Sequence, residues 1–406
     1  MEKKRLLFIG IIMNCAGTEK SFLSFVNSID FDKYSVDLIL AKNEGLFMEL
    51  IPKQVNVKFM PEYGDLFLLS GKNAVSNMFN TFVKKNPLTF FQILPYFVKF
   101  VLSPKQKVKT AIKLFCKMMK KIAPVTEEYD AAVAYWGDRT MFYMIDKVPN
   151  AKKKIAWMHF EYGTTERDDE IYSKYFKSCD NIVNVSNAVD KALKEKFPEI
   201  TDKCEVIENI QSVSMIRRLS LEQDSFPDMN HFKSTRILTI GRITEQKGLD
   251  MIPEILAKFK ENKYNLRWYI IGDGEQSEKE KIINLVLKYN VSEMLIFLGS
   301  TINPYPFMRD CDIYVQPSRF EGKPISVEEA KIIRCPIVAA NYLSAKEQLA
   351  DGKYGLIADI NPESLYEKIK EFIDDPDLRD KYIKTLSEEN FGTESEINKF
   401  YNLLEN

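Results

Sequence analysis

Short apolar runs alternate with helix-length segments along nearly the whole chain. A strand that returns as a parallel neighbour needs a crossover of about a dozen residues or more, so this alternation predicts parallel βαβ units. The expected strands are 6–10, 34–40, 55–60, 129–135, 154–160, 181–185 and 205–207 in the first half, and 236–240, 267–271, 295–298, 312–315, 336–339 and 355–358 in the second. The predicted fold class is therefore α/β, with doubly wound, Rossmann-like sheets.

The length of the chain predicts more than one domain, because 406 residues exceed what one hydrophobic core usually covers. Between residues 209 and 232 the apolar pattern lapses into polar residues, and we interpret this segment as a hinge. We expect a Rossmann-like domain over 1–210, a second over 211–385, and a final segment, 386–406, that crosses back to the first domain as a helix. Ligands of such sheets bind outside the carboxyl ends of the strands, so the site is expected in the cleft between the domains.

The composition disfavours several classes of function. The chain is 45% hydrophobic and 28% charged with a net charge of −1, so it has no overall basic field for nucleic acid. Its six cysteines include no C-x-x-C pair and it has only two histidines, so neither a metal site nor a disulfide framework is expected. The first apolar run is too short for a signal peptide, and no run of about eighteen apolar residues is present. A cytoplasmic protein is therefore predicted.

The first candidate site segment is 311–330, where an apolar strand leads into a short loop and a helix that opens at Pro324. A helix start carries free backbone N–H groups and readily binds an anion. Glu321 lies in the loop, and Glu329 lies about a turn and a half into the helix. Two carboxylates around an anion-binding helix start suit a ligand with a phosphate and several hydroxyls, such as a sugar nucleotide.

The second candidate segment is 241–248, directly after an expected strand. Its glycines permit a tight turn at the carboxyl end of that strand. Arg242 and Lys247 place two cations where a diphosphate would fit, the arginine as a fork and the lysine as a point charge. A surface turn with solvated charges is the alternative interpretation.

Together these segments resemble the family-4 retaining glycosyltransferases of the GT-B fold, most closely the bacterial enzymes that build capsular and exopolysaccharide repeat units. The resemblance is dense over the second half of the chain and thin over the first. The residues that carry it are G-R-I-T-E-Q-K-G (241–248), I-I-G-D-G-E (270–275), C-D-I-Y-V-Q-P-S-R-F-E-G-K-P-I-S-V-E-E-A (311–330) and L-A-D-G-K-Y-G-L (349–356), with A-G-T-E-K (16–20), K-K-I-A-W-M-H (153–159) and V-S (185–186) in the first half.

The resemblance implies a GT-B fold and sugar transfer from a nucleotide sugar, without a bound metal or further cofactor. It implies that Glu329 binds the ribose hydroxyls, that Glu321 reaches the donor sugar or the reaction centre, and that His159 contacts the donor sugar or the acceptor. Arg242 and Lys247 would stabilise the leaving diphosphate as its charge develops. The acceptor would attack from the face of the leaving group with retention of configuration, and the departing phosphate would take its proton.

Further residues are expected to line the nucleotide site: Gly17, Thr18, Gly241, Gly272, Gly274, Ser300, Thr301, Gly322, Lys323, Pro324 and Ile325. For Thr18 the alternative is a helix N-cap only. The turn at 272–274 lacks the third glycine of a dinucleotide fingerprint, so a nicotinamide site is not expected. The commoner family pattern has Phe-Gly-Leu-Pro after the first Glu-Gly. Here Pro324 removes one N–H from the phosphate cradle, and Lys323 is a candidate to replace it with a charge.

A long basic stretch in the first half contains no Asp or Glu between Asp65 and Glu127. Aromatic residues are interleaved with its eleven lysines, which are Lys72, Lys84, Lys85, Lys99, Lys105, Lys107, Lys109, Lys113, Lys117, Lys120 and Lys121. Such a composition is typical of helices that lie on an anionic bilayer. We expect peripheral contact with the inner face of the plasma membrane. A pair of core-packed helices with a solvated lysine face is the alternative.

The predicted function is that of a retaining glycosyltransferase, transferring a hexosyl or N-acetylhexosaminyl group. The donor would be a UDP-sugar and the acceptor a polyprenyl-diphosphate-linked saccharide in surface polysaccharide biosynthesis. One alternative is a non-hydrolysing sugar-nucleotide epimerase of the same architecture. The other is a non-catalytic nucleotide-binding partner of another transferase. The pairing of Arg242 and Lys247 with Glu321 and Glu329 argues against both.

Overall fold

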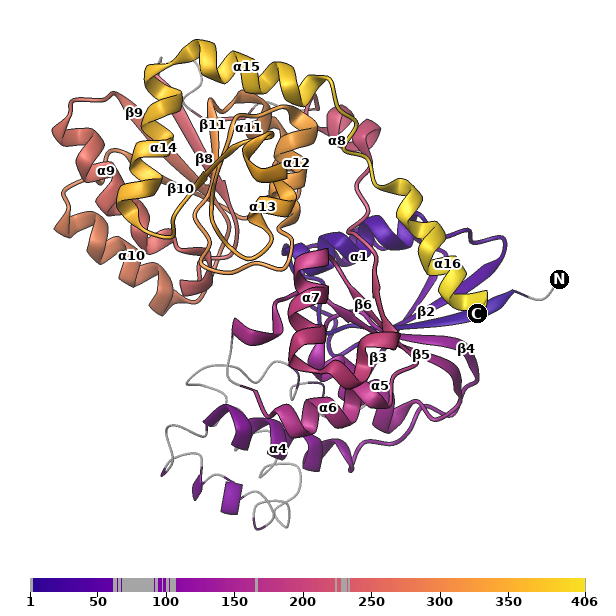
Figure 1. Ribbon diagram of the computed structural model, residues 1–406. Coiled ribbons are helices and arrows are strands. Elements are labelled where there is room, and N and C mark those ends of the chain that lie inside the picture. Colours follow the sequence, from indigo (N-terminus) through magenta and orange to yellow (C-terminus); the bar gives the residue numbers. More distant parts are fainter. Residues whose placement is uncertain are drawn as a thin grey trace.

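The computed structural model describes residues 3–60, 64, 67, 91, 94–96, 98–99, 102, 107–164, 167–222, 225–227, 232 and 234–405. Strands in these ranges form two parallel sheets, each with helices on both faces (Figure 1). Four of the eleven lysines of the predicted membrane-contacting stretch, Lys72, Lys84, Lys85 and Lys105, lie outside the described residues.

The first sheet has the strand order β3-β2-β1-β4-β5-β6-β7. Its strands are β1 (Lys4–Ile9), β2 (Tyr34–Leu40), β3 (Val55–Phe59), β4 (Tyr129–Ala134), β5 (Ala151–Met158), β6 (Asn181–Asn184) and β7 (Cys204–Val206). The helices of this domain are α1 (Gly17–Asn27), α4 (Lys107–Met119), α5 (Asp138–Lys147), α6 (Asp169–Lys177) and α7 (Asn187–Lys196). Apolar side chains of α4, α5, α6 and α7 form the core on one face of the sheet, and α1 covers the other.

The second sheet has the order β10-β9-β8-β11-β12-β13. Its strands are β8 (Thr235–Ile240), β9 (Leu266–Ile271), β10 (Leu295–Gly299), β11 (Ile313–Gln316), β12 (Ile337–Ala340) and β13 (Leu356–Ala358). Its helices are α8 (Val213–Leu219), α9 (Ile252–Glu261), α10 (Gln276–Lys288), α11 (Tyr305–Asp310), α12 (Ile325–Ile333), α13 (Ala345–Gln348), α14 (Pro362–Asp374) and α15 (Pro376–Ser387). The predicted doubly wound α/β fold is confirmed, and each expected strand coincides with an observed one.

Both sheets reverse their strand order at one point, between β1 and β4 in the first and between β8 and β11 in the second. Ligands of doubly wound sheets bind at the carboxyl ends of the strands beside such a reversal. The segment 241–248 follows β8, and the loop that holds Glu321 follows β11. Both predicted motifs therefore lie at the reversal of the second sheet.

The structure differs from the sequence-based expectation at several element boundaries. β5 begins at Ala151, three residues before the expected start, and α12 begins at Ile325 with Pro324 at its N-cap. The segment interpreted as a hinge contains the helix α8, whose Ile216 is fully buried in the core of the second domain. Isolated short helices show weak sequence patterns because tertiary packing stabilises them.

The C-terminal helix α16 (Ile397–Glu405) packs on the first domain, although α15 belongs to the second (Figure 1). The ring of Phe400 lies 5.0 Å from that of Phe25, and Tyr401 stacks on Tyr34 at 5.1 Å. The chain thus passes between the domains twice. The residue numbers 210 and 385 chosen for the domain boundaries stay predictions.

Among the residues that the structure describes, none of the helices combines the length and the apolar character needed to cross a bilayer.

Candidate functional site

The loop after β8 is held tightly against the end of β11. Gly248 adopts a φ of +66°, and a Cβ at this position would lie 2.2 Å from the backbone oxygen of Pro317. Only glycine allows both the left-handed conformation and this close approach. Arg319 N–H donates to the carbonyl of Gln246 at 2.8 Å, and Gln246 Nε2 donates to the carbonyl of Phe320 at 3.0 Å. These contacts fix the two motifs as one unit.

The side chains of Lys247 and Glu321 form the centre of this unit. Lys247 Nζ lies 2.6 Å from Glu321 Oε1, which also accepts hydrogen bonds from Ser318 Oγ at 2.6 Å and Gln316 Nε2 at 3.2 Å. Glu321 is 8% exposed. Tyr314 OH donates to Gln316 Oε1 at 2.6 Å and so orients the amide. A buried carboxylate with this many donors is held in one orientation.

Arg242 projects from the same loop and is exposed. It lies across the cleft from Glu19 in the first turn of α1, and its charge acts on that carboxyl group. Glu19 is 7% exposed, and burial raises its pKa to about 7 although Arg242 opposes this shift. Sequence reasoning missed Glu19. Its position in the first helical turn after β1, beside the predicted Gly17 and Thr18, could have indicated that Glu19 belongs to the site.

Glu329 of α12 meets the first domain directly. Its Oε1 lies 2.5 Å from Lys20 Nζ of α1 and accepts a hydrogen bond from Tyr305 OH at 2.9 Å. Lys20 and the importance of the Tyr305 hydroxyl were also missed. No local pattern connects a residue of α1 with one of α12.

The start of α12 touches the carboxyl end of β5 in the first domain. A Cβ at Gly322 would lie 2.3 Å from the backbone oxygen of His159, and Ser186 Oγ donates to the carbonyl of Gly322 at 3.2 Å. The backbones of the two domains therefore approach each other as closely as a glycine permits. The helix start of α12 faces the first domain at this point.

His159 lies half-buried at the end of β5, with its ring 4.8 Å from that of Tyr135. Burial lowers its pKa to about 3, so the imidazole is neutral. Neither His159 Nε2 nor Thr244 Oγ1 has a hydrogen-bond partner among the described residues, and both atoms are buried. Buried polar atoms are normally paired, so these two retain an unused capacity for a hydrogen bond.

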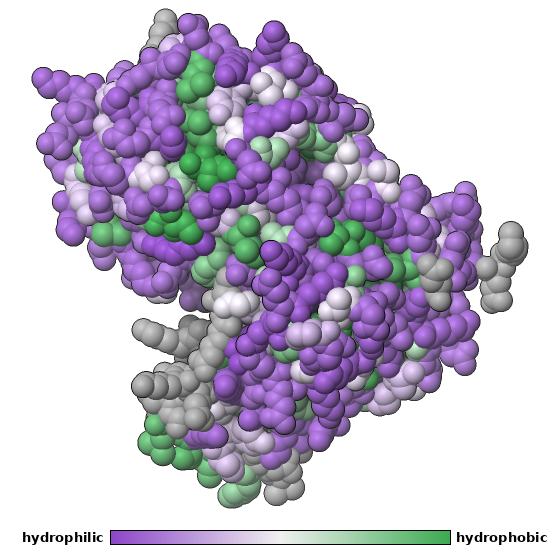
Figure 2. Space-filling model, viewed as in Figure 1, coloured by the Kyte–Doolittle hydropathy of each residue, from purple (hydrophilic) through white to green (hydrophobic). Residues whose placement is uncertain are grey.

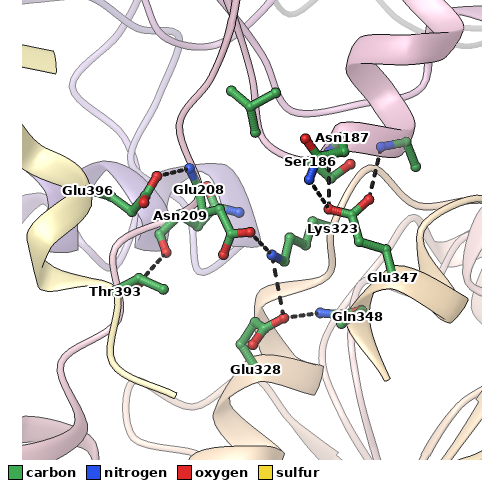
Figure 3. A network of polar contacts seen from close by, with 12 residues as sticks. Ser186, Asn187, Glu208, Asn209, Lys323, Glu328, Glu347, Gln348, Thr393 and Glu396 are labelled. Carbon is green, nitrogen blue, oxygen red and sulfur yellow. Dashed lines mark hydrogen bonds and ion pairs between the residues drawn. The ribbon is translucent and has the colours of Figure 1, made fainter. Parts of the chain in front are cut away.

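Lys323 points away from the start of α12. Its Nζ lies 2.7 Å from Glu208 of the interdomain segment and 4.0 Å from Glu328 (Figure 3). Burial alone would lower the pKa of Lys323, but Glu328 and Glu208 outweigh it and raise the pKa. Glu328 is itself bound by Lys331 at 2.6 Å. In this conformation the charge of Lys323 is engaged, and its role at a phosphate stays a prediction.

A second contact between the domains lies beside Lys323 (Figure 3). The carboxylate of Glu347 accepts the backbone N–H groups of Asn187 at 3.0 Å and Ala188 at 2.9 Å, at the N-terminus of α7. An anionic group is favourable there because the first N–H groups of a helix have no partner within it. This contact and that of Gly322 with Ser186 hold the domains together away from Glu329.

The remaining predicted residues surround the loop after β8. A Cβ at Gly272 would lie 1.9 Å from the carbonyl oxygen of Gly241, and one at Gly274 would lie 2.3 Å from that of Ile243. These glycines let the turn after β9 pack on the loop. Their contact with a nucleotide stays a prediction, as does that of Ile325 at the α12 start.

The first-domain loop before α1 also reaches the second domain. Cys15 Sγ donates to the carbonyl of Thr301 at 3.0 Å, which brings the exposed Ser300 and the half-buried Thr301 close to the start of α1. Gly17 has open space where a side chain would be. α1 begins at Gly17 with Ala16 at the N-cap and no side-chain cap, so the alternative that Thr18 only caps the helix is wrong.

Comparison with known proteins indicates the class to which the second domain is similar. Residues 223–388 match the family model described as Glycosyl transferases group 1. The second domain is thus similar to this family, and the pair of Rossmann-like domains has the GT-B arrangement.

Two of the relatives have names that state the sugar transferred. The chain is 26% identical over 214 residues to the N-acetylgalactosamine-N,N'-diacetylbacillosaminyl-diphospho-undecaprenol 4-alpha-N-acetylgalactosaminyltransferase of Campylobacter jejuni, covering 52% of this chain and 56% of that protein. It is 23% identical over 310 residues to the poly(ribitol-phosphate) alpha-N-acetylglucosaminyltransferase of Staphylococcus aureus, covering 75% of this chain and 61% of that one. The chain thus spans less than two thirds of either relative.

A solved structure matches the whole fold. The crystal structure of HepE from Anabaena in complex with UDP has a TM-score of 0.68 at 14% identity and covers 99% of both chains. At this identity the similarity establishes the fold alone.

Proposed function

We propose that this protein is a retaining glycosyltransferase that transfers a sugar from a UDP-sugar to a lipid-linked saccharide. The observation that carries the proposal is the joining of Lys247 with Glu321 at the strand-order reversal of the second sheet, with Glu329 close by on α12. This arrangement brings together a cation that suits a diphosphate and carboxylates that suit sugar hydroxyls. Helix α1 and His159 of the first domain lie opposite these groups.

Each charged group has a step to perform in this proposal. Arg242 and Lys247 stabilise the charge that develops on the leaving diphosphate, together with the backbone N–H groups at the start of α12. Glu329 accepts the ribose hydroxyls, and Glu321 accepts a hydroxyl of the donor sugar. The proton of the acceptor hydroxyl goes to the departing phosphate. His159, being neutral, contributes a hydrogen bond rather than a charge.

The choice of donor and acceptor draws on the relatives. The HepE structure contains UDP, which supports a uridine nucleotide. The name of the Campylobacter relative includes diphospho-undecaprenol, which supports a polyprenyl-diphosphate-linked acceptor in surface polysaccharide biosynthesis. The names of both relatives specify alpha linkages, which agrees with retention when the donor sugar is alpha-linked.

A lipid-linked acceptor has to be met at a membrane, and the first domain has a suitable surface. Phe91, Leu94, Val98 and Leu102 are exposed, with Phe91 at 69% and Leu102 at 74%. They lie just before the lysine-rich helix α4, where apolar surface is visible at the lower end of the first domain (Figure 2). We propose that this surface contacts the anionic inner leaflet of the plasma membrane.

Calorimetric titration with UDP and GDP tests the nucleotide site. We expect micromolar binding of UDP, weaker binding of GDP, and loss of UDP binding in Glu329→Ala. A preference for GDP would overturn the choice of base, and binding of neither would overturn the proposed site. The anomeric configuration of the product, determined by NMR, tests the mechanism, since an inverted linkage would exclude retention.

A further inference from the structure

Lys20 and Glu329 form an ion pair between the two domains. The distance from Lys20 Nζ to Glu329 Oε1 is 2.5 Å, and the exposed fractions of their side chains are 21% and 2%. Lys20 is in the second turn of α1, and Glu329 is in the middle of α12. The pair joins the reversal point of the first sheet to the helix that follows the reversal point of the second.

Tyr305 makes the pair a three-membered cluster. Its hydroxyl donates to Glu329 Oε1 at 2.9 Å, and Lys20 Nζ lies 4.3 Å from the centre of the Tyr305 ring. The ammonium group thus contacts both a carboxylate and an aromatic face. Burial alone would lower the pKa of Lys20, but the charge of Glu329 and the Tyr305 hydroxyl outweigh it and raise the pKa. Lys20 therefore stays charged.

The two partners of Glu329 differ in origin. Tyr305 belongs to the second domain and stays beside Glu329 in any arrangement of the domains. Lys20 comes from the first domain and reaches Glu329 only when the cleft is closed. In an open cleft water would solvate both charges, whereas in the closed cleft a nearly inaccessible carboxylate needs a cationic partner.

We propose that Lys20 is a positioning residue that orients Glu329 for the ribose hydroxyls when the cleft closes. The inference rests on the proposed function, because it assigns the ribose to Glu329. Lys20 does not itself touch the nucleotide. It holds the carboxylate in the orientation in which that group accepts the two vicinal hydroxyls, so that nucleotide binding and domain closure favour each other.

Removing Lys20 should leave the closed arrangement in place. Three other contacts also join the domains or the segment between them. They are the hydrogen bond from the backbone of Asn187 to Glu347, that from Ser186 to Gly322, and the ion pair of Lys323 with Glu208. A Lys20→Met variant therefore tests the orientation of Glu329 rather than closure itself. Small-angle X-ray scattering of the variant checks that its overall dimensions are unchanged.

The decisive experiment compares two ligands, UDP and 2′,3′-dideoxy-UDP, by calorimetry on the wild-type protein and on Lys20→Met. We expect Lys20→Met to weaken UDP about tenfold, the loss of one charge-assisted hydrogen-bond partner. The same variant should change the affinity for dideoxy-UDP less than about twofold, because that ligand lacks the hydroxyls that donate hydrogen bonds to Glu329. Lys20→Arg keeps the charge and should recover most of the UDP affinity.

Lys191→Met is the matched control, because Lys191 also pairs with a glutamate but is 79% exposed and 4.0 Å from Glu195. It should bind both ligands as the wild type does. An equal loss of both ligands in Lys20→Met would overturn the inference, since Lys20 would then act on the diphosphate or on the fold. No loss of either would overturn it as well. If the wild-type protein bound UDP and dideoxy-UDP equally, the proposed contact of Glu329 with the ribose hydroxyls would itself be wrong, and with it the inference about Lys20.

Discussion

Lys247 Nζ and Glu321 Oε1, 2.6 Å apart, join the loops that follow β8 and β11, the two strands between which the order of the second sheet reverses. Their side chains are only 15% and 9% exposed, so each charged group lies largely out of solvent beside a group of opposite charge. The pair is part of the structure of the site as well as of its proposed chemistry.

Removing one member of this pair should be worse for stability than removing both. Lys247→Met leaves Glu321 a buried carboxylate with only neutral donors, and we expect a loss of about 3 kcal/mol in the free energy of unfolding. The double variant Lys247→Met/Glu321→Gln should recover most of that stability. Neither variant should have measurable transferase activity. Thermal denaturation and a transfer assay measure the two effects. Restored activity in the double variant would contradict the proposed role of the cation.

Gly322→Ala should separate nucleotide binding from turnover. The added Cβ would lie 2.3 Å from the backbone oxygen of His159, so the domains must move apart. We expect a drop in kcat of about 100-fold, because a displacement of about 1 Å at a reacting centre costs that much, with a smaller change in UDP affinity. Gly163→Ala is the control, since its nearest neighbour, Glu161 Oε1, would be 3.9 Å away. Unchanged kcat in Gly322→Ala would contradict the need for this approach.

Glu19→Gln should stabilise the protein at alkaline pH only. Burial raises the Glu19 pKa from 4.5 to about 7 in the folded state, so the folded chain holds the extra proton between these values. The free energy of unfolding therefore falls as pH rises from about 4.5 to 7, by up to ~3 kcal/mol in total.

Glutamine stays neutral, so the variant should melt higher than the wild type at pH 8 and similarly at pH 4.5. Glu49→Gln, at an exposed position, should show no such difference. A variant that melts lower than the wild type at pH 8 would show that ionised Glu19 is stabilising, through Arg242.

A charge on the apolar surface before α4 should weaken membrane binding. We expect the wild-type protein to float with vesicles of phosphatidylglycerol at low salt and to be released at high salt. Leu102→Asp should weaken this binding about tenfold or more, because a fully inserted leucine contributes about 1.5–3 kcal/mol. Leu287→Asp on α10, where the leucine is 65% exposed, is the matched control. If both variants float equally well, the proposed surface is wrong.

Two kinds of sequence pattern, apolar periodicity and local motifs, predicted different parts of the structure. Apolar runs located every strand that the structure describes, because strands of a sheet covered on both faces are rich in apolar residues. Apolar periodicity did not reveal α8, whose seven residues are too few to show a period. The motifs at 241–248 and 311–330 indicated Lys247 and Glu321 separately, and the fold then brought them together.

What the sequence by itself determined is thus the order of strands and helices and the chemistry of the loops behind β8 and β11, because both depend on residues that are close in the chain. Only the tertiary structure decided that Lys20 meets Glu329, that Lys323 turns to Glu208, and that Gly322 lies against His159. These pairs are separated by 115 to 309 residues and join different domains or the segment between them. No local pattern encodes such contacts, since they arise only where the two domains meet in the folded protein.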